Sequence, residues 1–170
     1  MDWRELVRDV PDFPSPGILF KDIAPVLADA AALTAMTAEL IEVCRAEPVD
    51  FVVAVEARGF ILGAPVALAL GAGFVPVRKP GKLPHETRSV AYALEYGEAV
   101  LHMHLDALAP GDRVLIVDDV LATGGTLAAT AQLVRDAGAT PVAAAVLLEL
   151  GALGGRAAVA PLPVHFLLSV

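Results

Sequence analysis

The feature that most constrains the fold is the segment from Val114 to Thr126, which reads VLIVDDVLATGGT. A run of apolar, mostly β-branched residues leads into two carboxylates, Asp118 and Asp119, and then into small residues and threonines. A short apolar run of this kind is typical of a strand in a parallel sheet that is covered on both faces. Because such sheets bind ligands at the carboxyl ends of their strands, the polar residues that follow mark a candidate site.

The loop after this strand has the composition of a phosphate site. Its glycines, Gly124 and Gly125, let backbone N–H groups approach an anion, and a helix starting at Thr126 adds a positive dipole end. The hydroxyl groups of Thr123 and Thr126 are further donors. The two carboxylates would repel a phosphate, so we interpret them as acceptors for ligand hydroxyl groups or as partners of a metal ion. Together they predict a sugar phosphate.

Apolar runs and helical patterns alternate along the chain, which is typical of an α/β fold. We expect strands at 51–55, 74–78, 99–104, 113–117, 142–148 and 164–168, helices at 2–10, 30–45, 60–70 and 126–137, and irregular segments at 11–25 and 79–97. The pattern predicts a single-domain α/β fold over residues 1–170, with a parallel-centred sheet flanked by helices.

Composition excludes several classes of protein. The net charge of −8 argues against nonspecific binding to nucleic acid or membranes. We find no apolar segment of about 18 residues that could span a membrane and no secretory signal at the N-terminus. The single cysteine, Cys44, excludes an internal disulfide framework. We therefore expect a cytoplasmic protein.

Two further loops carry positive charge. Arg58 follows the predicted strand 51–55 in the sequence EARGF, and Arg78, Lys79 and Lys82 follow the next strand in RKPGKLP. Arg58 would suit an anion clamp, although pairing with Glu56 at the surface is the alternative. Two basic loops beside one phosphate loop favour a substrate with phosphates at both ends.

These segments, in this order, resemble the type I phosphoribosyltransferases, and among them the adenine-using branch. The resemblance is carried by residues 11–23 (PDFPSPGILFKDI), 56–60, 78–84, 94–97 (LEYG) and 117–126. It implies that 5-phosphoribosyl 1-pyrophosphate (PRPP) and adenine react to give AMP and pyrophosphate. It also implies Mg²⁺, bound mainly through the pyrophosphate of the substrate, and a homodimer.

The resemblance also implies a role for individual residues. A small hood over the base, mainly residues 1–28, would contain Leu19, Phe20 and Lys21, with Phe20 stacked on the purine and the Lys21 backbone at the adenine edge. Ordinary core packing is the alternative for Phe20. A mobile loop at about 83–97 would contain Glu95, the candidate acid–base catalyst, and Tyr96.

The remaining roles concern PRPP. The catalytic cation would be Arg58, which would contact pyrophosphate together with Lys79 and Lys82, one of these lysines acting across the dimer interface. Asp118 and Asp119 would hold the ribose hydroxyl groups. The residues implied for the 5′-phosphate are Ala122, Thr123, Gly124, Gly125 and Thr126.

Two other functions remain open on the sequence. A sister enzyme that uses hypoxanthine, guanine or xanthine would share the phosphate loop, but the Phe20-Lys21 pair resembles the adenine branch. A ligand-sensing regulator on the same fold would usually add a DNA-binding domain or a basic face, which this acidic chain lacks. His102 and His104 share a strand face without a third ligand, so no metal site built by the protein alone is predicted.

Overall fold

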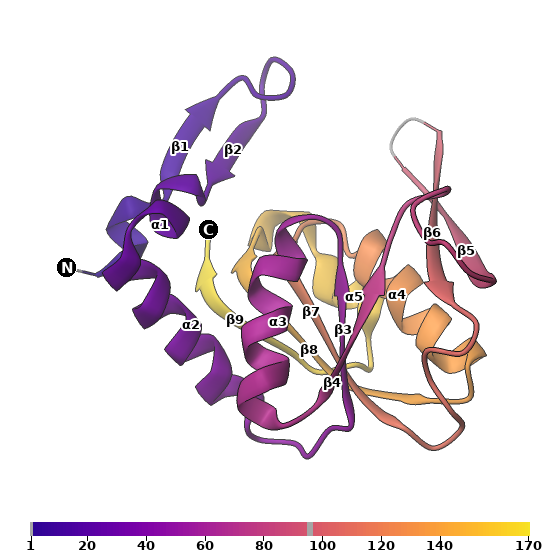
Figure 1. Ribbon diagram of the computed structural model, residues 1–170. Coiled ribbons are helices and arrows are strands. Elements are labelled where there is room, and N and C mark those ends of the chain that lie inside the picture. The colour runs from indigo at the N-terminus through magenta and orange to yellow at the C-terminus, as the bar shows by residue number, and fades with distance from the viewer. Residues whose placement is uncertain (1, 95–96) are drawn as a thin grey trace. The chain divides into compact units, whose positions relative to one another are not determined.

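The computed structural model describes residues 2–94 and 97–170 (Figure 1). The chain separates into two compact units, one ending at Glu39 and the other comprising Leu40–Val170. The predicted hood at 1–28 therefore lies within the first unit. Among the described residues, we find no helix that is both long enough and apolar enough to cross a membrane.

The N-terminal unit is a hairpin followed by helices. Its elements are the 3-10 helix η1 (Trp3–Leu6), β1 (Arg8–Pro11), β2 (Leu19–Asp22), α1 (Ala24–Ala28) and the part of α2 (Ala30–Cys44) that ends at Glu39. β1 and β2 are antiparallel, with Asp9 opposite Lys21. The predicted helix at 2–10 and the predicted irregular segment at 11–25 are therefore wrong in part. Short strands with exposed polar residues leave almost no apolar alternation in the sequence, so their pairing was not visible.

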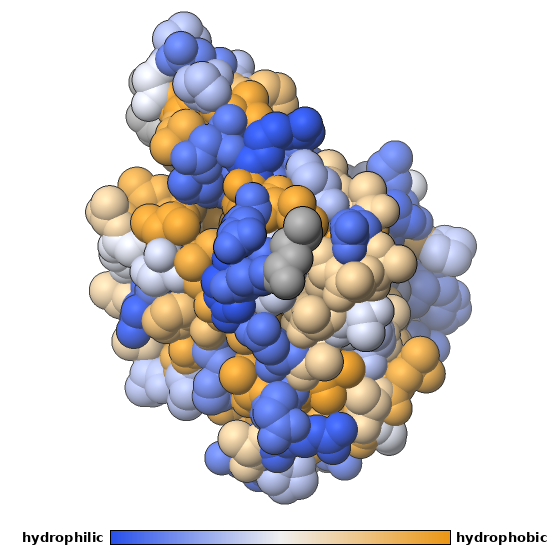
Figure 2. All heavy atoms as spheres, turned by 90° about the vertical axis from the view of Figure 1, so that its left-hand side faces the viewer, coloured by the Kyte–Doolittle hydropathy of each residue, from blue (hydrophilic) through white to orange (hydrophobic). Residues whose placement is uncertain are grey.

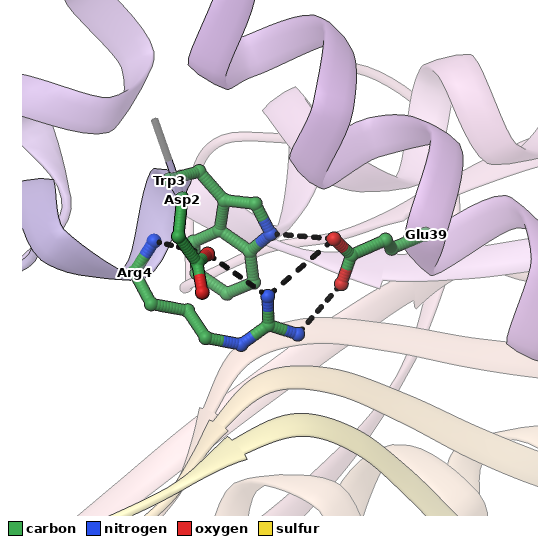
Figure 3. A network of polar contacts seen from close by, with 4 residues as sticks. All are labelled: Asp2, Trp3, Arg4 and Glu39. Carbon is green, nitrogen blue, oxygen red and sulfur yellow. Dashed lines mark hydrogen bonds and ion pairs between the residues drawn. The ribbon is translucent and has the colours of Figure 1, made fainter.

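A polar network attaches η1 to α2 (Figure 3). The indole nitrogen of Trp3, which is buried, donates to Oε1 of Glu39 at 3.1 Å, and Nη2 of Arg4 lies 2.6 Å from Glu39 Oε2. The Arg4 guanidinium also lies 4.4 Å from the centre of the Trp3 ring. The hydrogen bond from Arg4 is the main reason that the pKa of Glu39 falls below its ordinary value. The network holds η1 against α2.

The second unit is built on a parallel sheet. Its elements are β3 (Phe51–Val55), α3 (Arg58–Leu70), β4 (Gly73–Val77), β5 (Thr87–Ala93), β6 (Glu98–His104), β7 (Arg113–Leu121), α4 (Gly125–Asp136), β8 (Thr140–Glu149), η2 (Gly151–Leu153), α5 (Gly155–Val159) and β9 (Val164–Ser169). The strand order is β4-β3-β7-β8-β9, and every neighbouring pair is parallel. β5 and β6 form a separate antiparallel hairpin.

Both faces of the sheet are covered, which explains the uninterrupted apolar strands. Alternate residues such as Val53 and Ile116 join one core with Leu127 and Leu133 of α4. The intervening residues face α3, where a Cβ atom on Gly63 would meet that of Ala54 at 2.7 Å. α3 and α4 therefore occupy opposite faces of the sheet, and the predicted fold class is confirmed (Figure 1).

Two differences from the predicted elements bear on the site. β7 continues to Leu121, so Asp118 and Asp119 lie within the strand and not beyond its end. The predicted irregular segment 79–97 contains β5, in which half-buried residues on one face of a two-stranded hairpin alternate with exposed residues on the other. β5 was missed because its half-buried positions include the charged Arg88 and its exposed positions include two alanines, so the sequence does not alternate between apolar and polar residues.

Candidate active site

The carboxyl ends of β3, β4 and β7 bring three polar segments to one edge of the sheet. β3 is the shared neighbour: Val55 pairs with Val77 of β4, and Ala54 pairs with Val117 of β7. The segments that follow contain Glu56 and Arg58, then the basic loop from Arg78, then the two carboxylates and the glycine loop. This is the edge at which parallel α/β sheets bind ligands.

Asp118 and Asp119 are almost completely buried at this edge, each with 7% of its surface exposed. Oδ1 of Asp118 accepts a hydrogen bond from the Asp119 backbone N–H at 2.9 Å, and Nε of Arg58 donates to Oδ2 of Asp119. Burial, and then the neighbouring Asp119 carboxylate, raise the pKa of Asp118 well above its ordinary value of 3.8. A buried carboxylate with a raised pKa beside a second carboxylate is typical of a functional site.

Gly59 explains how α3 approaches these carboxylates so closely. A Cβ atom at this position would lie 3.0 Å from Oδ1 of Asp118 and 3.2 Å from the carbonyl oxygen of Val117. Any larger residue would push the first turn of α3 away from β7. The glycine of the EARGF segment therefore allows Arg58 to reach Asp119.

The predicted phosphate loop, residues 122–126, surrounds a small cavity of about 60 Å³ lined by residues 120–127. Gly124 precedes α4 in the left-handed backbone region, with φ at 89°, and its side-chain-free backbone caps the helix without any side-chain acceptor. Among the described residues, no side chain caps the first N–H groups of α4, and the residues that carry them line the cavity. Backbone donors with a helix dipole behind them form an anion site, so the predicted phosphate loop has a suitable shape.

A second segment packs directly against this loop. A Cβ atom on Gly124 would lie 2.5 Å from the carbonyl oxygen of Gly155, and one on Gly155 would lie 2.8 Å from Cδ1 of Leu121 and closer still to the carbonyl oxygen of Ala122. The two glycines allow backbone-to-backbone contact between the loop and the start of α5. Near the same segment, Arg156 forms a bidentate pair with the buried carboxylate of Glu149. Neither α5 nor this ion pair was predicted from the sequence.

The β5–β6 hairpin also reaches the phosphate loop. The hydroxyl group of Tyr92 lies 3.3 Å from Oγ1 of Thr126, and the Tyr92 ring would be 3.2 Å from a Cβ atom on Gly125. Tyr92 was not among the predicted site residues, because β5 itself was not predicted. The contact places one predicted phosphate donor, Thr126, in a hydrogen-bonding position beside an aromatic side chain.

Comparison with known proteins identifies the family. Residues 22–157 match the family model described as phosphoribosyl transferase domain. The chain is 63% identical over 169 residues to an adenine phosphoribosyltransferase of Nocardioides sp., which covers 97% of this chain and 91% of that protein. It belongs to the phosphoribosyltransferase family.

Solved structures of adenine phosphoribosyltransferases have the same fold. The enzyme of Thermoanaerobacter pseudethanolicus superposes with a TM-score of 0.96 at 48% identity, covering 98% of this chain and 97% of that one. The enzyme of Saccharomyces cerevisiae, complexed with adenine and an imino-altritol bisphosphate, superposes with a TM-score of 0.89 at 38% identity and covers 96% and 95%. This member of the phosphoribosyltransferase family is therefore similar to the adenine phosphoribosyltransferases over nearly its whole length, as its sequence motifs predicted.

The basic loop of this phosphoribosyltransferase is held by Glu56. Oε1 of Glu56 accepts from the Lys79 backbone N–H at 2.5 Å, and Oε2 accepts from Nη2 of Arg78 at 3.2 Å. These hydrogen bonds, chiefly the one from Lys79, lower the pKa of Glu56 below its ordinary 4.5. Lys79 and Lys82 are exposed, and among the described residues neither ammonium group forms an ion pair. The geometry thus leaves the two predicted pyrophosphate-binding lysines available for a ligand.

The predicted base-binding residues lie on the hairpin of the N-terminal unit. Leu19 is half exposed, as are Phe13 and Ile18, and the hairpin at the top of Figure 2 shows hydrophobic beside hydrophilic surface. Phe20 packs edge to face against Phe13, with ring centres 5.1 Å apart. Nζ of Lys21 is bound to Asp9 at 2.6 Å. Their role in binding adenine stays a prediction.

Glu95 and Tyr96 lie outside the described residues, so their predicted roles also stay predictions. For Mg²⁺, the donor set at the sheet edge can be compared with the ion's requirements. Mg²⁺ takes six oxygen ligands and usually keeps several waters together with substrate phosphates. Among the residues described, no group of three or more His, Cys, Asp or Glu side chains converges on one point. The carboxylate oxygens of Asp118 and Asp119 are ligands of the kind that Mg²⁺ takes, so this edge of the sheet fits an ion whose other ligands are waters and pyrophosphate oxygens.

Proposed function

We propose that this chain transfers the phosphoribosyl group of PRPP to adenine, forming AMP and pyrophosphate in purine salvage. The observation that carries the proposal is that the phosphate loop, which leads into α4, lies beside two buried carboxylates at one edge of the sheet. A 5′-phosphate in the loop and a ribose diol at the carboxylates would use both. The relatives support adenine as the base, and the yeast relative was crystallised with it.

In this reaction an imidazole nitrogen of adenine forms a bond to the anomeric carbon of the ribose. The bond from that carbon to pyrophosphate breaks, and its electron pair leaves with pyrophosphate. The sugar acquires positive charge as the leaving group departs, so catalysis depends on positioning and on charge control. We assign the positioning to the phosphate loop and to Asp118 and Asp119, which would anchor the ribose hydroxyl groups.

The cations act at the leaving group. Arg58, Lys79 and Lys82 would neutralise the departing pyrophosphate, and Mg²⁺ bound to the pyrophosphate oxygens would reduce its negative charge further. Arg58 already contacts Asp119. It therefore links the site assigned to the ribose with the site assigned to pyrophosphate, and we expect its guanidinium to turn toward the leaving group when PRPP binds.

The base is assigned to the hairpin and to the loop that contains Glu95. Phe20 would stack on the purine, and the backbone at Leu19 and Lys21 would meet its edge. Glu95 would accept the proton that adenine loses as the new bond forms, with Tyr96 beside it. Closure of the loop at 83–97 would exclude water, which otherwise hydrolyses PRPP.

We also propose a cytoplasmic homodimer. The surface of α3 carries a stripe of apolar residues at helical spacing, Ile61, Ala64, Pro65 and Leu68, of which Leu68 is 84% exposed. Such a stripe is unusual on the surface of a monomer and is suited to contact with a second copy. α3 starts at Arg58, so a dimer through this face would lie next to the active site.

The experiment is to incubate the purified chain with PRPP and MgCl₂ and to offer adenine, hypoxanthine or guanine separately. Pyrophosphate release is followed continuously, and the nucleotide product is identified by chromatography. We expect AMP with adenine and little turnover with the other bases. Comparable turnover of hypoxanthine would contradict the assignment of the base, and PRPP binding without turnover of any base would favour the ligand-sensing alternative.

A further inference from the structure

Glu56 has no role in the reaction described above, yet it lies between two of the loops assigned to pyrophosphate. It follows β3 directly and precedes Arg58 by two residues. Its backbone N–H donates to the carbonyl oxygen of Val77 at 3.0 Å, so it lies alongside the end of β4. Only 14% of its side chain is exposed. The carboxylate is thus largely covered, and its partners Arg78 and Lys79 follow β4, the strand that pairs with β3.

Both oxygens of this carboxylate are used by the basic loop. One accepts the Lys79 backbone N–H, and the other accepts Nη2 of Arg78. The second terminal nitrogen of Arg78 reaches forward to the carbonyl oxygen of Lys82 at 3.4 Å. A continuous series of hydrogen bonds therefore runs from Glu56 through the Arg78 guanidinium to the far end of the loop at Lys82.

The remaining support for the loop is at its start. The backbone N–H and carbonyl of Arg78 pair with His102 of β6 at 2.9 and 2.7 Å. From Lys79 to Lys82 the chain is exposed, and Gly81 adopts the left-handed backbone region with φ at 77°. Beyond Arg78, two hydrogen bonds to the loop depend on Glu56. Glu56 itself accepts the Lys79 N–H, and it holds the Arg78 guanidinium that donates to the Lys82 carbonyl.

We infer that Glu56 is a positioning residue for pyrophosphate: it fixes the loop 78–82 so that Lys79 and Lys82 face the leaving group. The inference rests on the proposed function. A carboxylate would repel pyrophosphate, so Glu56 acts through its partners and not as a ligand. It also brings negative charge close to Arg78, which keeps that guanidinium within the loop and leaves the two lysines as its outward-facing cations.

The test compares Glu56→Gln and Glu56→Ala with the wild-type enzyme. Glutamine keeps the acceptor for the Lys79 N–H but loses the charge that holds Arg78, whereas alanine loses both contacts. Loss of one charge-assisted hydrogen bond corresponds to roughly a tenfold change in an equilibrium constant. We expect the KM for PRPP to rise about tenfold in Glu56→Gln and further in Glu56→Ala, with the KM for adenine within about twofold of wild type.

The matched control is Glu47→Gln. Glu47 also pairs with an arginine, at 3.0 Å from Nη2 of Arg113, but it precedes β3 and so lies at the opposite end of the strand. We expect its kinetics to equal those of the wild type. Melting temperatures of all variants show whether each is folded at the assay temperature.

A double-variant cycle with Arg78→Met separates this mechanism from a general disturbance. If Glu56 acts through Arg78, Glu56→Gln combined with Arg78→Met will raise the KM for PRPP no more than the worse single variant does. Additive effects, an equal rise in the KM for adenine, or an unchanged KM for PRPP in Glu56→Gln would overturn the inference. None of these results would affect the proposed function, which fails only if the wild-type chain does not convert adenine.

Discussion

Gly155→Ala should disturb the phosphate loop from outside the site. The new Cβ would meet two atoms of the loop at under 3.0 Å, the carbonyl oxygen of Ala122 and Cδ1 of Leu121. Gly155 does not adopt a positive φ, so the substitution introduces a clash without backbone strain. Because a backbone oxygen cannot turn aside as a flexible side chain can, α5 and the loop must separate.

The size of the effect follows from two opposing terms. Overpacking in a close-packed region costs about 1–3 kcal/mol, and a clash with backbone belongs near the upper end. Replacing glycine by alanine in a helix contributes up to about 1 kcal/mol in the opposite direction. The net loss is therefore about 1–2 kcal/mol, which for a chain of this size lowers the melting temperature by about 2–8 °C.

The assay is thermal unfolding together with the KM for PRPP, measured beside a control, Gly151→Ala. A Cβ on Gly151 meets nothing closer than Oγ of Ser169 at 3.4 Å, an ordinary contact, so this variant gains propensity without a clash. We expect Gly155→Ala to melt earlier and to bind PRPP more weakly, while Gly151→Ala matches the wild type in both. If the two variants behave alike, α5 does not support the loop and the reasoning is wrong.

Three further outcomes are expected. Glu95→Gln should lower kcat by about 100–10,000-fold with little change in KM if Glu95 transfers a proton, and a loss under about tenfold would restrict it to loop closure. Asp118→Asn should weaken the use of PRPP yet raise the free energy of unfolding. Since the folded pKa lies above the ordinary 3.8, wild-type stability falls as the pH rises above that value, so the gain should appear at neutral pH and vanish below about pH 4. A gain that persists at pH 3 in urea unfolding would refute this explanation. Leu68→Glu should convert a dimer to monomer in light scattering at micromolar concentration, whereas the control Leu105→Glu, at another exposed leucine, should not; a Leu68 variant that remains dimeric would exclude this face of α3.

The elements that the sequence predicted well are those buried on two sides. β3 and β8 carry unbroken apolar runs, and α4, which lies between β7 and β8 in the chain, has apolar residues at helical spacing. The parallel sheet and its helices could therefore be predicted from local pattern alone. The hairpins β1–β2 and β5–β6 could not, because two-stranded ribbons bury too little to impose alternation on the sequence.

The site was predictable to the extent that its residues are contiguous. The carboxylates and the phosphate loop follow one another in a single segment, and the structure keeps both at one edge of the sheet, although the carboxylates lie inside β7 and not beyond its end. Contacts between residues far apart in the sequence could not be predicted. Glu56 is close to Arg58 in the sequence, but in the structure it binds Arg78. Tyr92 contacts Thr126 from a hairpin that was itself not predicted. Such pairs depend on strand order, which local composition does not encode.

The position of the two carboxylates inside β7 has a consequence for how the molecule opens. β7 is the central strand of the sheet, with β3 on one side and β8 on the other, so its amide protons should exchange with solvent only on global unfolding. The loop 78–82 and the β5–β6 hairpin lie outside the five-stranded sheet. Their amide protons should exchange, and proteases should cleave them, after local openings of much lower free energy. In a partly opened molecule the loop assigned to pyrophosphate would be displaced, while the carboxylates assigned to the ribose would remain in place. Pyrophosphate would then be released before AMP.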